Sequence, residues 1–210
     1  MKLTKLGHAC WRFEKDGRTF VLDPGSFSGT GLLDDAEAVL ITHEHADHVD
    51  QNLIKSAGAD LEVWTCNGVT TALGEVPVKI QTVREGDVFD VAGFSVRVIG
   101  EWHAPTVPDA PIIQNIGFLI DDRVFYPGDA LTVPNVAVET LLVPSNAPWL
   151  RVWDFVEYLR AVHPDHAFST HDGLVNEIGS GMIDNFLAME GKSQKSDMRR
   201  LKPGESIEFA

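Results

Sequence analysis

The chain has 210 residues, of which 44% are hydrophobic and 23% are charged, and its formal net charge is −14. This composition is typical of a soluble globular protein, and we expect one domain spanning residues 1–210. The negative charge disfavours nucleic acid as a partner, because phosphate backbones are bound by clustered lysine and arginine. No apolar run approaches the ~20 residues of a membrane helix, and no signal-peptide pattern opens the chain. We therefore expect a cytoplasmic protein without a membrane partner.

Hydrophobic periodicity and turn residues predict many short strands interrupted by four helices. The predicted strands are residues 3–6, 10–13, 19–22, 38–41, 61–65, 78–83, 88–91, 94–99, 116–120, 123–126, 141–143, 167–169 and 206–209. The predicted helices are residues 49–57, 67–73, 151–162 and 176–189. Residues 104–111, with three prolines, and residues 145–149 are expected to form loops around a substrate pocket.

A cluster of residues that commonly bind metals follows one of the buried strands. After the apolar run 38–41 come His43, His45, Asp47 and His48, at a predicted strand-to-helix turn. Alternation along an extended backbone places His43 and His45 on the same side. A solvated turn is the plainer alternative, but four such side chains at the end of a buried strand would be costly without partners. The helical His-Glu-x-x-His zinc motif is excluded, because Asp47 stands where its second histidine should be.

Three further predicted strands lead into a histidine or an aspartate. His103 follows strand 94–99, Asp129 follows strand 123–126 through Pro-Gly, and His171 follows strand 167–169. One histidine after a strand means little. An ordered series of such strand ends predicts one composite site.

This ordered series resembles the signature of the metallo-β-lactamase superfamily. The patterns Leu-Gly-His-Ala at residues 6–9 and Leu-Asp-Pro at residues 22–24 resemble the branch with ascorbate-6-phosphate lactonase-like proteins and N-acyl-phosphatidylethanolamine phospholipases. The resemblance implies an α/β fold, a four-layer αββα sandwich with a one- or two-metal site at one edge. It also implies the ligands. We expect metal one on His43, His45 and His103, metal two on Asp47, His48 and His171, and Asp129 as the bridge between the metals.

The resemblance suggests roles for residues near this centre. His8 is expected to be catalytic, by contacting the substrate or donating a proton, with a satisfied loop histidine as the alternative. Asp23 is expected to accept a hydrogen bond from a metal-bound histidine, unless it only caps the turn that follows it. Trp102 and Trp149 are candidates for the pocket wall or for core packing.

Five imidazoles and two carboxylates without a thiolate suit two Zn²⁺ ions, with Mn²⁺ and Fe²⁺ as alternatives. We therefore expect a binuclear hydrolase that uses a metal-bridging hydroxide to cleave a lactone, ester, amide or phosphodiester bond. Its substrate is expected to be a small, anionic molecule. A thioesterase and a mononuclear iron thiol dioxygenase are alternatives on the same fold, and a non-catalytic metal-binding protein is an alternative of another class.

Overall fold

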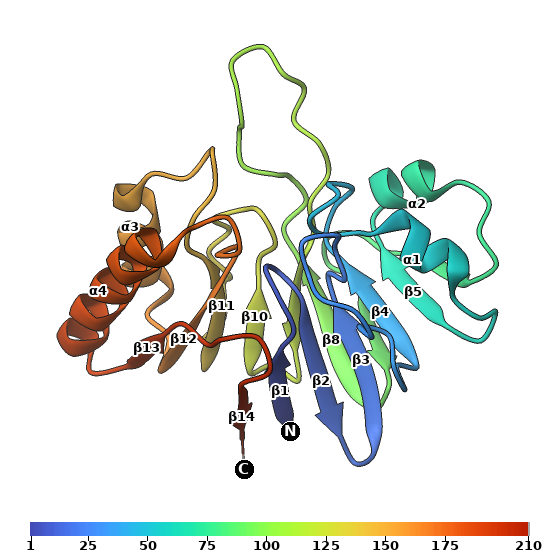
Figure 1. Ribbon diagram of the computed structural model, residues 1–210, viewed down its shortest axis with the longest axis horizontal. Coiled ribbons are helices and arrows are strands. Elements are labelled where there is room, and N and C mark those ends of the chain that lie inside the picture. The colour runs from blue at the N-terminus through green and yellow to red at the C-terminus, as the bar shows by residue number, and fades with distance from the viewer. Residues whose placement is uncertain (210) are drawn as a thin grey trace.

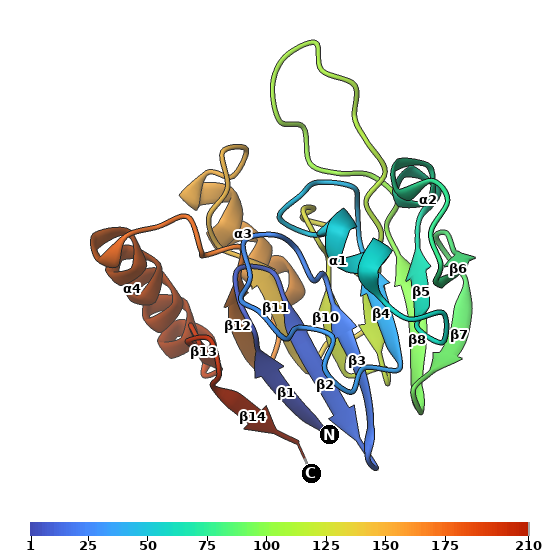
Figure 2. The ribbon, with the colours of Figure 1, turned by 45° about the vertical axis from the view of Figure 1, so that its right-hand side comes forward.

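The computed structural model describes residues 1–209, which form two seven-stranded sheets packed face to face (Figures 1 and 2). The first sheet has the order β14 (Ser206–Glu208), β1 (Lys2–Lys5), β2 (Trp11–Lys15), β3 (Arg18–Leu22), β4 (Ala38–Ile41), β5 (Glu62–Thr65) and β6 (Lys79–Thr82). The second has the order β13 (Asp197–Arg199), β12 (His166–Thr170), β11 (Thr140–Pro144), β10 (Val124–Tyr126), β9 (Gly117–Ile120), β8 (Phe94–Ile99) and β7 (Val88–Val91).

The core lies between the two sheets and is rich in aromatic side chains. Phe13 and Phe20 are cross-strand partners on β2 and β3, and their rings stack at 4.6 Å. Phe94 from β8 of the opposite sheet meets the Phe20 ring edge-on at 4.9 Å. All three side chains are fully buried. Each contributes about 1.5–3 kcal/mol through the removal of apolar surface from water, which holds the two sheets together.

Helices cover the outer faces of the sandwich. α1 (Gln51–Ser56) and α2 (Asn67–Leu73) lie on the side of the first sheet, whereas α3 (Val152–Val162) and α4 (Glu177–Gln194) lie on the side of the second (Figure 1). In α3, Phe155 and Leu159 are spaced four residues apart and face the same way. They pack with Leu141 and Val143 of β11 in a second buried cluster. The four layers confirm the α/β sandwich expected from the sequence.

The predicted elements are present with small shifts of their ends, and the main differences lie near the C-terminus. α4 continues to Gln194, five residues beyond the predicted end, and stops where Lys195 adopts a left-handed conformation. An unpredicted edge strand, β13, then pairs in parallel with β12. It has three residues, of which only Met198 is buried, so it is too short for hydrophobic alternation to reveal it. Among residues 1–209, no helix is long and apolar enough to cross a lipid bilayer.

Candidate metal centre

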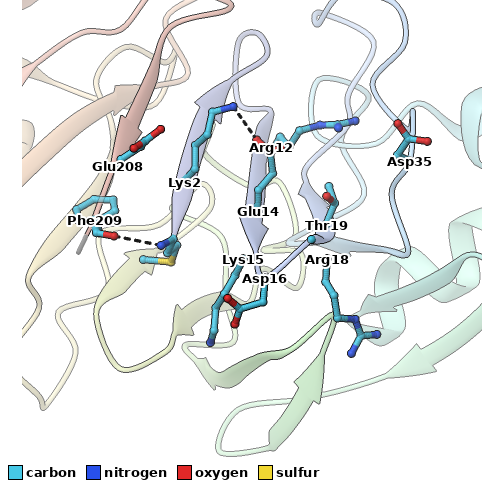
Figure 3. Close-up of a pocket in the computed structure, with 12 residues that line it drawn as sticks. Lys2, Arg12, Glu14, Lys15, Asp16, Arg18, Thr19, Asp35, Glu208 and Phe209 are labelled. Atoms are coloured by element: carbon cyan, nitrogen blue, oxygen red, sulfur yellow. Dashed lines mark hydrogen bonds and ion pairs between the residues drawn. The ribbon is translucent and has the colours of Figure 1, made fainter.

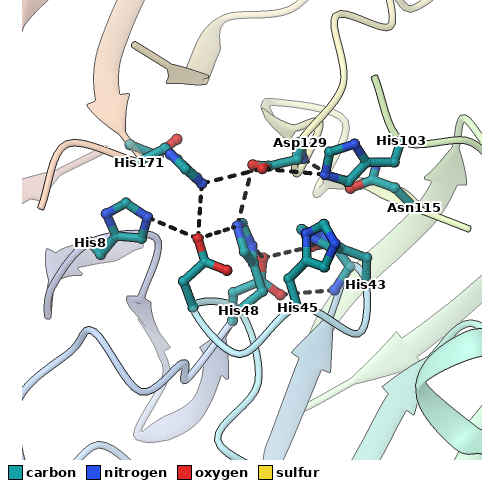
Figure 4. Close-up of polar contacts among 12 residues, drawn as sticks. His8, His43, His45, His48, His103, Asn115, Asp129 and His171 are labelled. Carbon is teal, nitrogen blue, oxygen red and sulfur yellow. Dashed lines mark hydrogen bonds and ion pairs between the residues drawn. The ribbon is translucent and has the colours of Figure 1, made fainter. Parts of the chain in front are cut away.

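Five strand ends meet at one edge of the sandwich and carry the predicted site residues. β3 and β4 are parallel neighbours in the first sheet, and β8, β10 and β12 run in one common direction in the second. Their carboxyl ends therefore open at the same edge. Asp23 follows β3, His43 follows β4, His103 follows β8, Asp129 follows β10 and His171 follows β12. Figure 4 shows the labelled side chains of this edge converging on a common centre.

One group of candidate ligands contains His43, His45, His103 and Asp129, whose ligand atoms all lie within 4.8 Å of one another. His43 Nε2 and His45 Nδ1 are 3.1 Å apart. The His103 ring lies with its centroid 4.9 Å from the His43 ring, and its Nε2 is 3.4 Å from Asp129 Oδ2. The three histidines expected for metal one are therefore brought together.

A second group contains His48, His171 and Asp129, again within 4.8 Å. His171 Nε2 lies 3.2 Å from Asp129 Oδ2 and 3.1 Å from Asp47 Oδ2. His48 Nε2 lies 3.2 Å from Asp129 Oδ1. Asp129 is thus shared by the two groups, in the position that a bridging ligand needs. The division of the seven side chains between two metals stays a prediction.

Unpaired buried atoms indicate that this centre suits cations. The Nε2 atoms of His48, His103 and His171 and Oδ1 of Asp129 are buried and have no hydrogen-bond partner among residues 1–209. Buried polar atoms without a partner are rare, because each carries the full cost of desolvation. Since all four atoms belong to the two groups and are of the kinds that bind transition metals, a bound cation would satisfy them together.

The other ring nitrogen of each of these histidines is held by an acceptor. His103 Nδ1 donates to the carbonyl oxygen of Ala104 at 2.6 Å, and His171 Nδ1 donates to that of Asn146 at 2.5 Å. A ring that carries its proton on Nδ1 leaves Nε2 with a free lone pair for a metal. The backbone therefore selects the tautomer that ligation requires.

Asp23 supports His48 in the same way. The His48 Nδ1 atom lies 2.6 Å from Asp23 Oδ2, which also accepts from the hydroxyl groups of Tyr126 at 2.8 Å and Thr42 at 2.7 Å. Asp23 is fully buried. Its carboxylate is therefore an anchor for a candidate ligand, the first of the two roles considered for it. Sequence reasoning missed Tyr126 and Thr42, although Thr42 directly precedes His43 and Tyr126 ends the strand that leads to Asp129.

Two glycines and an asparagine hold the ligand-bearing loops in place. Gly25 approaches the metal-motif loop so closely that a Cβ atom there would lie 1.8 Å from the carbonyl oxygen of Asp47. Gly128 adopts a φ of 63°, and it precedes Asp129 as predicted. Asn115, which sequence reasoning also missed, accepts from the Asp129 backbone N–H at 2.9 Å and donates to the Pro127 carbonyl at 2.8 Å. Its side chain therefore locks the turn that presents Asp129.

The two tryptophans considered for the pocket have different surroundings. Trp149 is partly buried, lies with its ring centroid 5.8 Å from that of His103, and donates from its indole nitrogen to Asp129 Oδ2 at 3.1 Å. Trp102 is 54% exposed and pairs through its backbone with Gln114 at the base of loop 104–113. Trp149 is therefore part of the centre, whereas Trp102 lies on the outer surface beside it.

Burial and neighbouring charges move the imidazole pKa values in opposite directions. Burial holds the pKa of His43 well below its ordinary value. Burial would also lower the pKa of His171, but the carboxylates of Asp129 and Asp47 raise it to about 9. The pKa of His48 is likewise raised against the effect of burial, mainly by Asp129. Burial therefore dominates at His43, whereas the carboxylates dominate at His48 and His171.

His8 lies at the rim of the second group with its side chain fully buried. Its Nδ1 accepts from the backbone N–H of Gly173 at 2.9 Å, and its Nε2 lies 3.3 Å from Asp47 Oδ2. The catalytic role expected for His8 stays a prediction.

A cavity of about 600 Å³ lies near the β2–β3 turn (Figure 3), at the opposite end of the first sheet from the centre. Three of its cationic side chains, those of Lys2, Lys15 and Arg18, are paired with carboxylates, and Arg12 donates to the backbone carbonyl of Asp34. Lys2 lies 3.2 Å from Glu14, and Arg18 lies 2.6 Å from Glu37. These neutralised pairs lack the convergent, unsatisfied atoms of the candidate metal centre, so the cavity is the weaker site.

Comparison with known proteins agrees with this geometry. The family model for the beta-lactamase superfamily domain matches residues 2–171. Protein Rv0786c of Mycobacterium tuberculosis is 36% identical over 184 residues, which cover 83% of this chain and 85% of that protein. The UPF0173 metal-dependent hydrolase of Rhizobium etli is 31% identical, and 99% of each chain is covered.

Among solved structures, the metallo-beta-lactamase fold protein YhfI from Bacillus subtilis aligns over 99% of each chain with a TM-score of 0.74 and 15% sequence identity. This likeness shows the fold. The family match spans the strand ends from β1 to His171, which include every candidate ligand described above. The chain therefore belongs to the beta-lactamase superfamily and is a metal-dependent hydrolase with the metallo-β-lactamase fold.

Proposed function

We propose that the protein is a binuclear hydrolase that cleaves a lactone, ester, amide or phosphodiester bond of a small, anionic molecule. The observation that carries this proposal is the sharing of Asp129 by two ligand groups. A single structural metal would be satisfied by four protein ligands, whereas seven side chains around two ions leave open coordination positions.

The side-chain chemistry favours zinc. Imidazole nitrogens dominate the two groups, Asp129 is shared by them, Asp47 adds a second carboxylate beside His171, and neither Cys10 nor Cys66 belongs to them. This mixture of nitrogen and oxygen ligands suits Zn²⁺, while Mn²⁺ and Fe²⁺ also accept it. Two such ions would lower the pKa of a water molecule between them and stabilise negative charge that develops on the substrate.

The residues of the chain would set the geometry of the centre and the sign of its net charge. Asp129 is placed to offset repulsion between two dications, and Trp149 and Asn115 hold its side chain and its backbone. Two dications outweigh the charges of Asp47 and Asp129. The loaded centre would thus be positive within a protein of formal charge −14, which supports an anionic or strongly polarised substrate group.

The substrate itself is proposed to enter beside loop 104–113. A small cavity of about 40 Å³ lies between this loop and the two ligands His45 and His103. Val107 and Ile112 of the loop are 62% and 52% exposed. A positive centre with an apolar flank suits a small molecule that combines an anionic or carbonyl group with an apolar part.

Metal analysis and substrate screening together test the proposal. The purified protein is expected to hold close to two zinc ions per chain after dialysis, measured by elemental analysis. The zinc- and manganese-loaded protein would then be assayed on a panel of lactones, esters, amides, thioesters and phosphodiesters. One iron per chain with oxygen consumption would replace the proposal by a thiol dioxygenase. A folded protein that takes up no metal from excess would overturn it.

A further inference from the structure

His8 connects two loops of the candidate metal centre, the loop with Asp47 and the loop at residues 171–173. Its ring Nε2 faces Asp47, its ring Nδ1 faces the backbone of Gly173, and its backbone carbonyl accepts from the N–H of His171 at 2.9 Å. The His8 and His171 rings are also in contact, with centroids 4.1 Å apart. A residue that follows β1 thus touches both loops that carry the second group.

The contact with Gly173 determines where the His8 ring carries its proton. A backbone N–H can only donate, so Nδ1 of His8 must offer a lone pair. A neutral ring with an unprotonated Nδ1 carries its proton on Nε2, and that nitrogen then donates to Asp47 Oδ2. A protonated Nε2 cannot bind a metal. His8 is therefore a donor to a candidate ligand, although its ring lies within 4.8 Å of two other potential ligand side chains.

The loop that carries His171 needs such support. His171 has a φ of 57°, in the left-handed region that is uncommon for a non-glycine residue. The two backbone contacts with His8 lie on either side of the intervening residue, Asp172. Asp172 is itself held by Lys5 of β1, whose buried Nζ lies 2.8 Å from Asp172 Oδ1.

The burial of His8 also argues against direct contact between its side chain and a substrate. Its side chain is fully buried, and both ring nitrogens are engaged. Phe27 covers it with an edge-on ring contact at 5.6 Å. A Cβ atom on Gly173 would lie 3.0 Å from His8 Nδ1, which shows how tightly loop and ring fit.

We propose that His8 is a positioning residue, which aligns the Asp47 carboxylate and the His171 loop for the second metal without contacting the substrate. The inference rests on the proposed two-metal centre. Loss of His8 should weaken the second metal position selectively, by about 10–100-fold, the usual effect of removing a partner of a metal ligand. The first position should be nearly unaffected, because His43, His45 and His103 do not touch His8.

Two amide substitutions separate the contacts of the ring. In His8→Asn the amide oxygen can replace Nδ1 as acceptor for Gly173, but the side chain is too short to reach Asp47. In His8→Gln the amide nitrogen can replace Nε2 as donor to Asp47. The second-site affinity should therefore fall in the order wild type, His8→Gln, His8→Asn. Gly173→Ala, which presses on the ring from the opposite side, should resemble His8→Asn.

The affinities of both sites would be measured by calorimetric titration with Zn²⁺, and the second site would be followed by the visible spectrum of bound Co²⁺. His163→Asn is the matched control, because His163 is exposed at the C-terminal end of α3 in a left-handed conformation that asparagine tolerates. Unfolding temperatures of the metal-free proteins would show whether the variants still fold.

The outcomes distinguish the possible roles of His8. Selective loss of the second metal, with turnover recovered in excess zinc, supports positioning. Unchanged binding of both metals with turnover that stays low in excess zinc would make His8 a proton donor and overturn the inference. Equal weakening of both sites would mean that His8 has only a general structural role, which would also overturn the inference. A wild-type protein that binds only one metal would instead contradict the proposed binuclear function.

Discussion

The indole N–H of Trp149 donates a hydrogen bond to Asp129 Oδ2 over 3.1 Å, and the same oxygen faces both candidate metal positions. Trp149 lies in the loop after β11, twenty residues beyond its partner. The sequence predicts this loop beside the substrate pocket. Its indole contacts the Asp129 carboxylate directly, where it limits the rotation of the shared ligand.

Trp149→Phe should therefore weaken metal binding without unfolding the protein. The variant keeps most of the ring packing against His103 but loses the donor, and we expect about tenfold weaker binding of at least one metal. Trp153→Phe is the control, because Trp153 is 73% exposed on α3. Zinc titration of both variants decides the matter. Equal affinities in the two would mean that the hydrogen bond does not hold Asp129.

Asp129→Asn should weaken metal binding more than Trp149→Phe does. The amide keeps the shape of the side chain but removes the charge that offsets two dications. We expect lower occupancy of at least one metal and a loss of turnover above about 100-fold, since even indirect partners of metal ligands are worth 10–100-fold. Asp122→Asn, on an exposed turn, is the matched control. Elemental analysis, circular dichroism and turnover would be compared. Two bound metals and near-normal turnover in Asp129→Asn would mean that Asp129 does not bridge the metals.

Alanine substitutions should separate the two ligand groups. His48→Ala and His171→Ala are expected to lose the second metal, whereas His103→Ala should weaken the first, because the Nε2 atoms of these residues face different positions. All three variants should remain folded and lose most hydrolytic activity. Calorimetric zinc titration resolves the sites. If His171→Ala still bound two metals with unchanged affinity, the second site would lie elsewhere.

The affinity for the second metal should rise with pH. His171 has a pKa of about 9, so at pH 7 it must release a proton before its Nε2 can bind a cation. Release of the proton on His171 should then increase the affinity by about tenfold per pH unit up to about pH 9. The pKa of His43 is lowered instead, so the first site should change little over this range. Zinc titrations between pH 7 and 9 test this contrast; parallel behaviour of both sites would contradict it.

Much of the fold was readable from local sequence patterns. The apolar run of β4 ends in the metal motif, and helix α2 has the bounds that were predicted for it. Such elements are set by short-range hydrophobic periodicity and turn residues, which the sequence displays directly. Strand β13 was missed because three residues carry too little periodicity, and its pairing with β12 depends on the tertiary structure.

The candidate ligands were likewise predictable, because each follows a buried strand and the carboxyl ends of parallel strands share one edge. The side chains that hold them were not. Tyr126 reaches Asp23 across 103 residues, and His8 meets Gly173 across 165. Such contacts depend on which strands pair, in which register, and how closely two loops approach. The sequence alone therefore determined which residues could bind metals, whereas the tertiary structure decided which partners orient them and which ring nitrogen carries each proton.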